Sequence, residues 1–304
     1  MRIGLITADP GHQLLADTAE LLSPRHEVVA IDPGGRGAGA RATADPGAHT
    51  AVPSEDAADP GELADVYLLK ARTPHALALA RSLERRGAPV VNSAAATALC
   101  QDRTAMAHVA LRAGLPFAPT RTVASLAGLT AERLPHPVVV KSRHSRRHDL
   151  VARVDDAARL RALSADWADE PVVVQDFTPN DGWDHKLWVI AGRVFAALRR
   201  SELAAGGRGP SLPLALDALP PGWLDPVRHV GSVFSLEVYG VDLIDAGGGA
   251  PLIVDINAFP GIRGQAGAPE ALAALALRTA ERGGLTAPPP MTDTREILGD
   301  SRPK

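Results

Sequence analysis

The sequence predicts an α/β protein in which an open lobe with a parallel sheet is followed by a region of antiparallel strands. In the first hundred residues, short apolar runs alternate with segments of helical periodicity, which is the signature of repeated β–α–β units. After residue 102, the apolar runs become rich in valine and other strand-forming residues, and one pair is joined by a tight glycine turn. A chain of 304 residues is long enough for two domains or for several lobes of one protein.

The first lobe contains four predicted strands, over residues 2–7, 27–31, 66–70 and 89–92. Between them, apolar residues recur at helical spacing, first at Leu14, Leu15, Thr18, Leu21 and Leu22. The turn over residues 8–12 lacks the three-glycine pattern that brings a backbone against a pyrophosphate, so dinucleotide binding is unsupported there. Residues 32–65 are rich in Gly, Pro, Ala and Asp and are predicted to form a long surface loop.

The second region begins with a predicted helix over residues 103–112, which ends at Gly114. Pro116 and Pro119 favour an extended connector after it. Strands are then predicted over residues 137–141, 171–177, 186–190 and 193–198, and Gly192 supplies the turn of a hairpin between the last two. We therefore expect an antiparallel sheet in this part of the chain.

Composition excludes several classes of protein. The net charge of −3 argues against general nucleic-acid binding, which needs a strongly basic surface. Cys100 is the only cysteine, which rules out an internal disulfide framework and a cysteine-based zinc site. No apolar run approaches the roughly 20 residues of a membrane span, and the first apolar run is too short for a signal peptide. We expect an intracellular, cytoplasmic protein that acts on small molecules, not on a membrane.

Two apolar runs near the C-terminal end each deliver a carboxylate, Asp242 in the first and Asp255 in the second. Side chains two residues apart on a strand point to the same face, so Asp255 and Asn257 are expected to lie together. Mg²⁺ takes one or two protein carboxylates and completes its octahedron with water and phosphate oxygens. The pattern predicts a metal–triphosphate site, with turn and capping roles as the alternative for these residues.

The order of the motifs carries a resemblance that periodicity alone does not give. The chain resembles the ATP-grasp enzymes, in particular the branches that are similar to the ribosomal-protein glutamate ligase and the inositol trisphosphate kinase. The matching motifs cover about residues 90 to 280 and are Val91-Asn92-Ser93, Gln101-Asp102-Arg103, Gly114-Leu115-Pro116, Val139-Val140-Lys141, Val174-Gln175-Asp176-Phe177, Gly182-Trp183-Asp184-His185-Lys186, Arg199-Arg200, Gly240-Val241-Asp242 and Asp255-Ile256-Asn257-Ala258-Phe259-Pro260-Gly261.

The resemblance implies a fold and a division of the chain. An N-terminal open parallel α/β lobe would cover residues 1–100, and an ATP-grasp domain would cover residues 101–286. Within that domain, a small central lobe over about residues 117–177 and a C-terminal antiparallel-sheet lobe would clamp ATP between them. Residues 287–304, which begin with three prolines close together, are predicted to be a mobile tail.

The resemblance also implies roles for individual residues. ATP and Mg²⁺, with Mn²⁺ as a substitute, would be the cofactors, and the metal ligands would be Asp242, Asp255 and Asn257. Lys186 and Arg200 would face the transferred phosphate as catalytic residues. The residues implied to bind ATP are Arg103, Lys141, Gln175, Asp176, Phe177 and Asp184. Arg103 stands where relatives have Lys and could instead be an ordinary first-turn residue, and Lys141 could be a solvated strand end.

The substrate side is predicted from arginines. The segment over residues 141–149 has no glycine and carries Arg143 and Arg147, where relatives have a mobile, glycine-rich loop. These arginines could bind triphosphate or an anionic co-substrate through bidentate hydrogen bonds, or could belong to a solvated basic loop. Arg263 is a further candidate anchor for a substrate carboxylate or phosphate.

Two functions remain open at this level. The first is a carboxylate–amine ligase, which forms an acylphosphate from a small-molecule or peptide carboxylate and ATP, and then an amide with an amine. The second is a small-molecule kinase that resembles the inositol polyphosphate kinases, because Lys186 replaces an arginine common among peptide ligases. Related enzymes are often dimers or tetramers, so a homo-oligomer is compatible with either.

Overall fold

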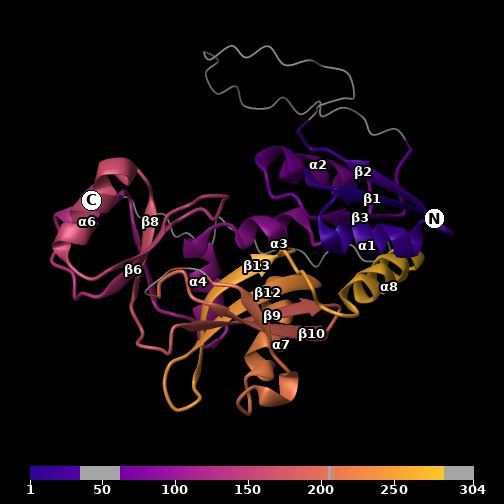
Figure 1. Ribbon diagram of the computed structural model, residues 1–304. Coiled ribbons are helices and arrows are strands. Elements are labelled where there is room, and N and C mark those ends of the chain that lie inside the picture. Colours follow the sequence, from indigo (N-terminus) through magenta and orange to yellow (C-terminus); the bar gives the residue numbers. More distant parts are fainter. Residues whose placement is uncertain (35–61, 205–206, 208, 284–304) are drawn as a thin grey trace.

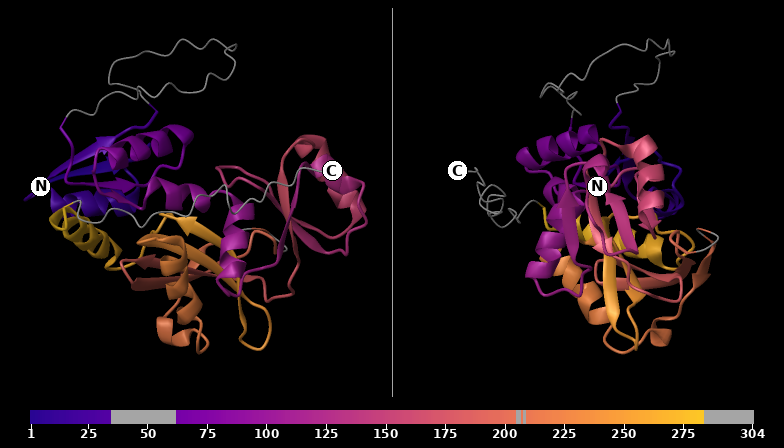
Figure 2. Two further views of the ribbon diagram at one scale, coloured as in Figure 1. Left: turned by 180° about the vertical axis from the view of Figure 1, so that it is seen from behind. Right: turned by 90° about the vertical axis from the view of Figure 1, so that its left-hand side faces the viewer.

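The computed structural model describes residues 1–34, 62–204, 207 and 209–283. The predicted tail over residues 287–304 and most of the predicted loop over residues 32–65 lie outside these ranges. Figure 1 shows the N-terminal lobe and the central lobe at opposite ends of the molecule, with the C-terminal sheet between and below them, and the view from behind agrees (Figure 2). The expected α/β architecture with an N-terminal parallel sheet is confirmed. The strands expected to form one antiparallel sheet are divided between two antiparallel sheets.

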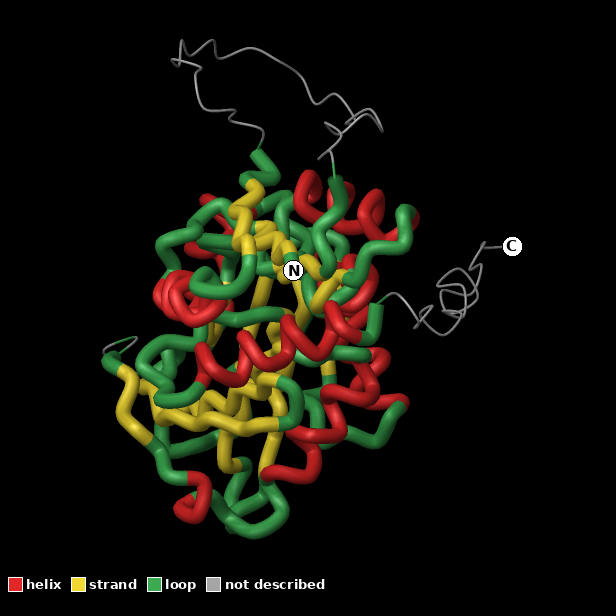
Figure 3. The backbone as a smooth tube through the Cα atoms, turned by 90° about the vertical axis from the view of Figure 1, so that its right-hand side faces the viewer, coloured by secondary structure: helices red, strands yellow, loops and turns green. Residues whose placement is uncertain are grey.

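The N-terminal lobe is built on a parallel sheet with the strand order β2-β1-β3-β4. The four predicted strands are all present, although the fourth is short: β1 (Arg2–Ile6), β2 (Glu27–Ile31), β3 (Val66–Leu69) and β4 (Val90–Val91). The helices of this lobe are α1 (Gln13–Leu22), α2 (Pro74–Arg85) and α3 (Ala94–Leu99). Seen from the side of this lobe, helices lie outside the strands (Figure 3).

The central lobe is a small antiparallel sheet with two helices and a core of its own. Its strand order is β5-β8-β6-β7. The elements are β5 (Thr120–Val123), α5 (Leu126–Thr130), β6 (Val138–Ser142), β7 (Val151–Val154), α6 (Ala157–Trp167) and β8 (Val172–Asp176). Valines fill both faces of β6 and β8, which explains why these two strands read as continuous apolar runs.

The C-terminal sheet has the strand order β11-β10-β9-β12-β13. Its strands are β9 (Trp183–Ile190), β10 (Arg193–Arg200), β11 (Ser211–Pro213), β12 (Val238–Asp245) and β13 (Pro251–Ala258). The β9–β10 hairpin has the predicted turn, but Ala191 as well as Gly192 has a positive φ, of 48° and 83°. Two positive φ values in a two-residue loop are the twist that suits a hairpin.

The two faces of the C-terminal sheet pack against different partners. On one face, α4 (Arg103–Arg112) and α7 (Leu224–Phe234) bury Met106, Trp223 and Phe234 against the apolar side chains of β9, β12 and β13. A single-turn helix, η1 (Leu216–Ala218), precedes α7. A second core joins the sheet to the N-terminal lobe, where α8 (Ala268–Glu281) packs on α1. The polar side chains of the sheet take no part in either core and are available to form a site.

No helix in the described ranges is long and apolar enough to cross a membrane.

Specific hydrogen bonds connect the lobes. Asn92, which is buried, donates to the carbonyl of Val238 at 2.7 Å and accepts from the amides of Glu237 and Val238 at 2.9 and 3.0 Å. Between the central lobe and β13, Ile253 donates to Pro116 and Ala118 donates to Ile253.

Candidate active site

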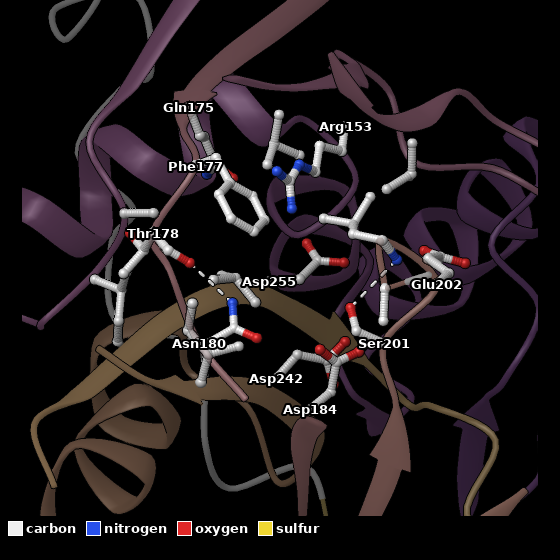
Figure 4. Close-up of a pocket in the computed structure, with 18 of the residues that line it drawn as sticks. Arg153, Gln175, Phe177, Thr178, Asn180, Asp184, Ser201, Glu202, Asp242 and Asp255 are labelled. Carbon is white, nitrogen blue, oxygen red and sulfur yellow. Dashed lines mark hydrogen bonds between the residues drawn. The ribbon is translucent and has the colours of Figure 1, made fainter. Parts of the chain in front are cut away.

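A cavity of about 320 Å³ lies between the central lobe and the C-terminal sheet. This volume lies at the lower end of the range for small-molecule sites. Strands from both lobes line it, and Figure 4 shows carboxylates at its floor and an aromatic ring at its upper wall. Of the residues predicted to bind ATP, metal or phosphate, all but Asn257 line it: Arg103, Lys141, Gln175, Asp176, Phe177, Asp184, Lys186, Arg200, Asp242 and Asp255.

The floor of the cavity is the polar face of β9, β12 and β13. Asp242 lies directly opposite Asp255 on one side and opposite Lys186 on the other. Lys186 donates to Asp242, and its Nζ lies 3.4 Å from Asp184 Oδ2 on the same face of β9. The register of β12 and β13 shifts between Asp242 and Leu243, and such a bulge turns side chains at the edge of a site.

Cations from two other elements surround Asp255. Arg103, the first residue of α4, lies 3.7 Å from Asp255 Oδ2 and 2.6 Å from Asp149 Oδ2. Lys141, near the end of β6, is buried and donates to the carbonyl of Val254 at 2.7 Å. Arg103 is thus both a first-turn residue, as the alternative interpretation had it, and a residue of the cavity.

Burial and neighbouring charges shift the pKa values of Asp242 and Asp255 in opposite directions. Burial raises the pKa of Asp242, and the pairing with Lys186 opposes this rise. Burial also acts to raise the pKa of Asp255, but Arg103, Lys141 and Lys186 together hold that pKa below its usual value. The pKa of Lys141 is lowered by burial, despite the two nearby carboxylates. Asp255 is therefore the carboxylate that stays ionised most readily.

The donor set fits a hard divalent cation that also binds phosphate. Asp242, Asp255 and the side-chain oxygen of Asn257 would hold it, and Asn257 Nδ2 lies 3.4 Å from Asp255 Oδ2. Among the described residues, no group of three or more His, Cys, Asp and Glu side chains could hold a metal ion alone. The two carboxylates with Asn257 suit Mg²⁺, which binds through one or two carboxylates and takes further ligands from substrate phosphates.

The upper wall of the cavity is formed around the aromatic ring of Phe177. The guanidinium of Arg153 lies 3.9 Å from the centre of the Phe177 ring (Figure 4). Gln175 turns away from the cavity centre to donate to Thr120 at 2.9 Å, and Asp176 is exposed at the strand end. The amide of Phe177 donates to the carbonyl of Pro137, so Phe177 offers its ring and not its N–H. A flat heterocycle would fit beside this pair.

The predicted substrate arginines do not line the cavity. Arg143 makes a bidentate pair with Asp102, the N-cap residue of α4, at 2.7 to 3.2 Å. Arg147 is exposed and contacts only its neighbour His148 among the described residues. Arg263 is exposed on the segment that follows β13. Their substrate roles stay predictions.

Arg199 and Arg200 occupy different positions. Arg200 lines the cavity and lies 5.8 Å from the Trp183 ring. The register places Arg199, and not Arg200, opposite Asp184, and the buried Nε of Arg199 has no hydrogen-bond partner among the described residues. Arg200 is the residue predicted to be catalytic, and the register that pairs Arg199 with Asp184 is not visible in the sequence.

Several lining residues were missed by the sequence analysis. Arg153 was the clearest signal, since it alternates with Val151 on β7 and both line the cavity. Asn180 and Ser201 come from loops, where no periodicity marks them. Asp149, which does not itself line the cavity, holds the lining residue Arg103 across 46 residues of sequence, and no local pattern reveals such a contact.

No family model matches this chain. Its structure is similar to that of a RimK domain ATP-grasp protein from Sphaerobacter thermophilus, with a TM-score of 0.70 at 23% identity over 92% of this chain and 99% of the other. It is also similar to D-alanine–D-alanine ligase from Bacillus anthracis (TM-score 0.66, 15% identity, 94% and 97% covered) and to the macrocyclase MdnC from Microcystis aeruginosa (0.61, 13%, 91% and 100%). The chain therefore has the ATP-grasp fold.

Proposed function

We propose that this protein is an ATP- and Mg²⁺-dependent carboxylate–amine ligase. The observation that carries the proposal is one cavity in which an aromatic wall at Phe177 lies opposite a floor of paired carboxylates and lysines. This arrangement matches a nucleotide lying with its base in the central lobe and its phosphates over the sheet. Similar structures include PsnB in complex with a precursor, Mg and ADP.

Phosphoryl transfer needs positioning and charge neutralisation more than covalent help from the protein. A substrate carboxylate oxygen would attack the γ-phosphorus, the bond to the β,γ-bridging oxygen would break, and ADP would leave. Lys141, Lys186 and Arg103 would neutralise the negative charge that spreads over the phosphoryl oxygens. Asp242, Asp255 and Asn257 would hold Mg²⁺, which would supply further positive charge to offset the charge on the phosphates.

A ligase must exclude water because water would hydrolyse the acylphosphate before the amine reacts. An amine nitrogen would attack the acyl carbon, phosphate would leave, and the amine would lose a proton to yield the amide. The loop at Ser201 and Glu202 lies at the edge of the cavity (Figure 4). It is placed where it could shield the acyl group from water.

A small-molecule kinase is the second candidate. It is favoured by the cations Lys70 and Arg72 beside Asn257, at the phosphate end of the site, where a polyphosphate acceptor could bind. In a kinase, a hydroxyl oxygen would take the γ-phosphoryl group, and inorganic phosphate would not form.

Phosphorus NMR of the protein with ATP, Mg²⁺ and a small-molecule extract separates the two. We expect ADP and inorganic phosphate together, with both lost in Asp255→Ala, because that change removes the carboxylate that stays ionised most readily. The matched control is Asp166→Asn on the exposed surface of α6, which should react like the wild type. ADP with a new phosphate ester and no inorganic phosphate would overturn the ligase in favour of the kinase. Unchanged turnover in Asp255→Ala would overturn the assignment of the metal site.

A further inference from the structure

We propose that His12, Lys70, Arg72 and Arg263 form a subsite for a second anionic group on the carboxylate substrate, either a further carboxylate or a phosphate. We call these four residues the basic cluster. The inference rests on the proposed ligase function, because it names the class of acid that the ligase would activate. Three of the four residues come from the N-terminal lobe, which has no part in the nucleotide cavity described above.

The cluster converges on the segment that follows the predicted metal ligands. Lys70 donates to the carbonyl of Phe259 at 3.1 Å, and Arg72 lies 3.4 Å from the side-chain oxygen of Asn257. A Cβ atom built on Gly261 would lie 3.5 Å from His12 Nε2, so the imidazole packs against the backbone there. Arg263 follows two residues later. The four side chains thus surround one short stretch of chain.

The positive charge of the cluster is not neutralised within the described part of the chain. None of Lys70, Arg72 and Arg263 forms an ion pair with a described residue. Asp9 is the nearby carboxylate, and its effect on Lys70 is weaker than that of Arg72 or Arg263. Burial lowers the pKa of Lys70 to about 8, and the two arginines add to this. A buried lysine held beside two further cations is typical of a site that receives an anion.

His12 gives an independent indication of a ligand. This residue is buried, with 8% of its surface exposed, yet neither ring nitrogen has a hydrogen-bond partner in the part of the chain that the structure describes. A buried polar group without a partner is unfavourable, so it calls for a missing acceptor or donor. His12 is also the N-cap residue of α1, whose first turn carries no acidic side chain. The positive end of this helix therefore adds to the attraction for an anion.

The position of the cluster selects the part of the substrate that it would hold. Asn257 does not line the cavity, but it contacts both Arg72 and Asp255, which lies at the cavity floor. Phe177 and Arg153 mark the opposite, base end in the central lobe. The reacting carboxylate must lie against the γ-phosphate, so it cannot also occupy the cluster. A second oxyanion on the same molecule would reach it, and arginine can bind either a carboxylate or a phosphate in bidentate geometry. The preferred acid is therefore di- or polyanionic.

NMR of the His12 imidazole in the nucleotide-free protein tests binding without any ATP chemistry. The signal is assigned with His12→Gln, and the probes are glutarate, inorganic phosphate and acetate. We expect glutarate or phosphate to move the His12 signal at lower concentration than acetate, and the more effective of the two identifies the group. Arg72→Gln and, separately, Arg263→Gln should weaken this binding about tenfold or more, while the exposed Arg278→Gln on α8 should not. A signal that no probe moves, or equal affinities in all variants, would overturn the subsite.

A hydroxylamine trap separates this failure from failure of the proposed function. With Mg²⁺, ATP and hydroxylamine, an acylphosphate is converted to a hydroxamate and phosphate. Hydroxamate from glutarate in preference to acetate, together with a moved His12 signal, supports both the ligase and the subsite. Hydroxamate without any His12 shift keeps the ligase and rejects the subsite. A His12 shift without hydroxamate from either acid keeps the anion site and counts against the ligase.

Discussion

At the scale of single residues, the site is a balance of buried charges that the sequence only partly reveals. The alternation of Asp255 and Asn257 on one strand predicted that they share a face, and Asn257 Nδ2 indeed lies 3.4 Å from Asp255 Oδ2. Arg143 shows why the rest could not be predicted. Its partner Asp102 is 41 residues away, and no local pattern in the sequence shows that this arginine pairs with a helix N-cap.

Lys70 should make the protein less stable than an uncharged residue at that position would. Burial lowers its pKa from 10.5 to about 8, so folding disfavours its charged form. The unfolded chain holds this proton up to the higher pKa, and the folded chain loses it near the lower one. The cost is therefore fully present below about pH 8 and fades as the pH rises from 8 to 10.5.

Lys70→Met is expected to increase the free energy of unfolding by about 1 to 3 kcal/mol near neutral pH. The increase should shrink as the pH approaches the unfolded-state pKa. Urea unfolding at several pH values measures this, with Arg278→Met as an exposed control whose effect does not vary with pH. Parallel stability curves for wild type and Lys70→Met would contradict the depressed pKa. A residue that destabilises the fold in this way is more easily understood as part of a binding site.

At the scale of elements, the features that depend on local sequence were the most predictable. The predicted helix over residues 103–112 has the bounds of α4, and Gly114 has a φ of +73°. Apolar periodicity and glycine geometry are local, so a sequence displays them directly. The contacts that build the cavity come from β6, β7 and β8 in one lobe and from β9, β12 and β13 in another. Such pairings depend on tertiary packing, and strand patterns do not specify them.

Arg153 and Phe177 face each other near the ends of β7 and β8, and this contact between elements can be tested. Arg153 also contacts Asp155 at 2.7 Å, but the two side chains are 37% and 58% exposed, so solvent screens the pair and it adds little stability. Arg153→Ala should raise KM for ATP about three- to tenfold through the lost stacking contact, with kcat nearly unchanged. Steady-state kinetics measures this change, and Arg161→Ala on the exposed surface of α6 is the matched control.

The binding of tripolyphosphate gives the sharper control for Arg153. This ligand has phosphates but no base, so its inhibition constant should be the same for wild type and Arg153→Ala. If tripolyphosphate binding weakens as much as ATP binding does, Arg153 contacts the phosphates, and the base does not lie against Phe177.

At the scale of the whole molecule, the lobes are joined unequally. The N-terminal lobe shares an apolar core with the C-terminal sheet and is fastened to it by the three hydrogen bonds of Asn92. The central lobe has a separate core that contains residues from β6, β7, β8, α5 and α6. A ligand in the cavity would touch both the central lobe and the C-terminal sheet, so its binding would add contacts between these two parts.

Binding of Mg²⁺ with a non-hydrolysable ATP analogue should therefore slow amide hydrogen exchange in some parts of the chain and not in others. Openings that separate the central lobe from the sheet destroy the site, so they become rarer in proportion to ligand saturation. At a ligand concentration about a hundred times Kd, exchange over β6, β8, β12 and β13 should slow by up to about a hundredfold. Local openings of β1 and β2, which do not line the cavity, should exchange at an unchanged rate. Asp255→Ala should lose the part of the effect that requires Mg²⁺. Equal slowing in β1 would show that the lobes open as one unit, and no slowing in β6 and β8 would show that the central lobe does not hold the nucleotide.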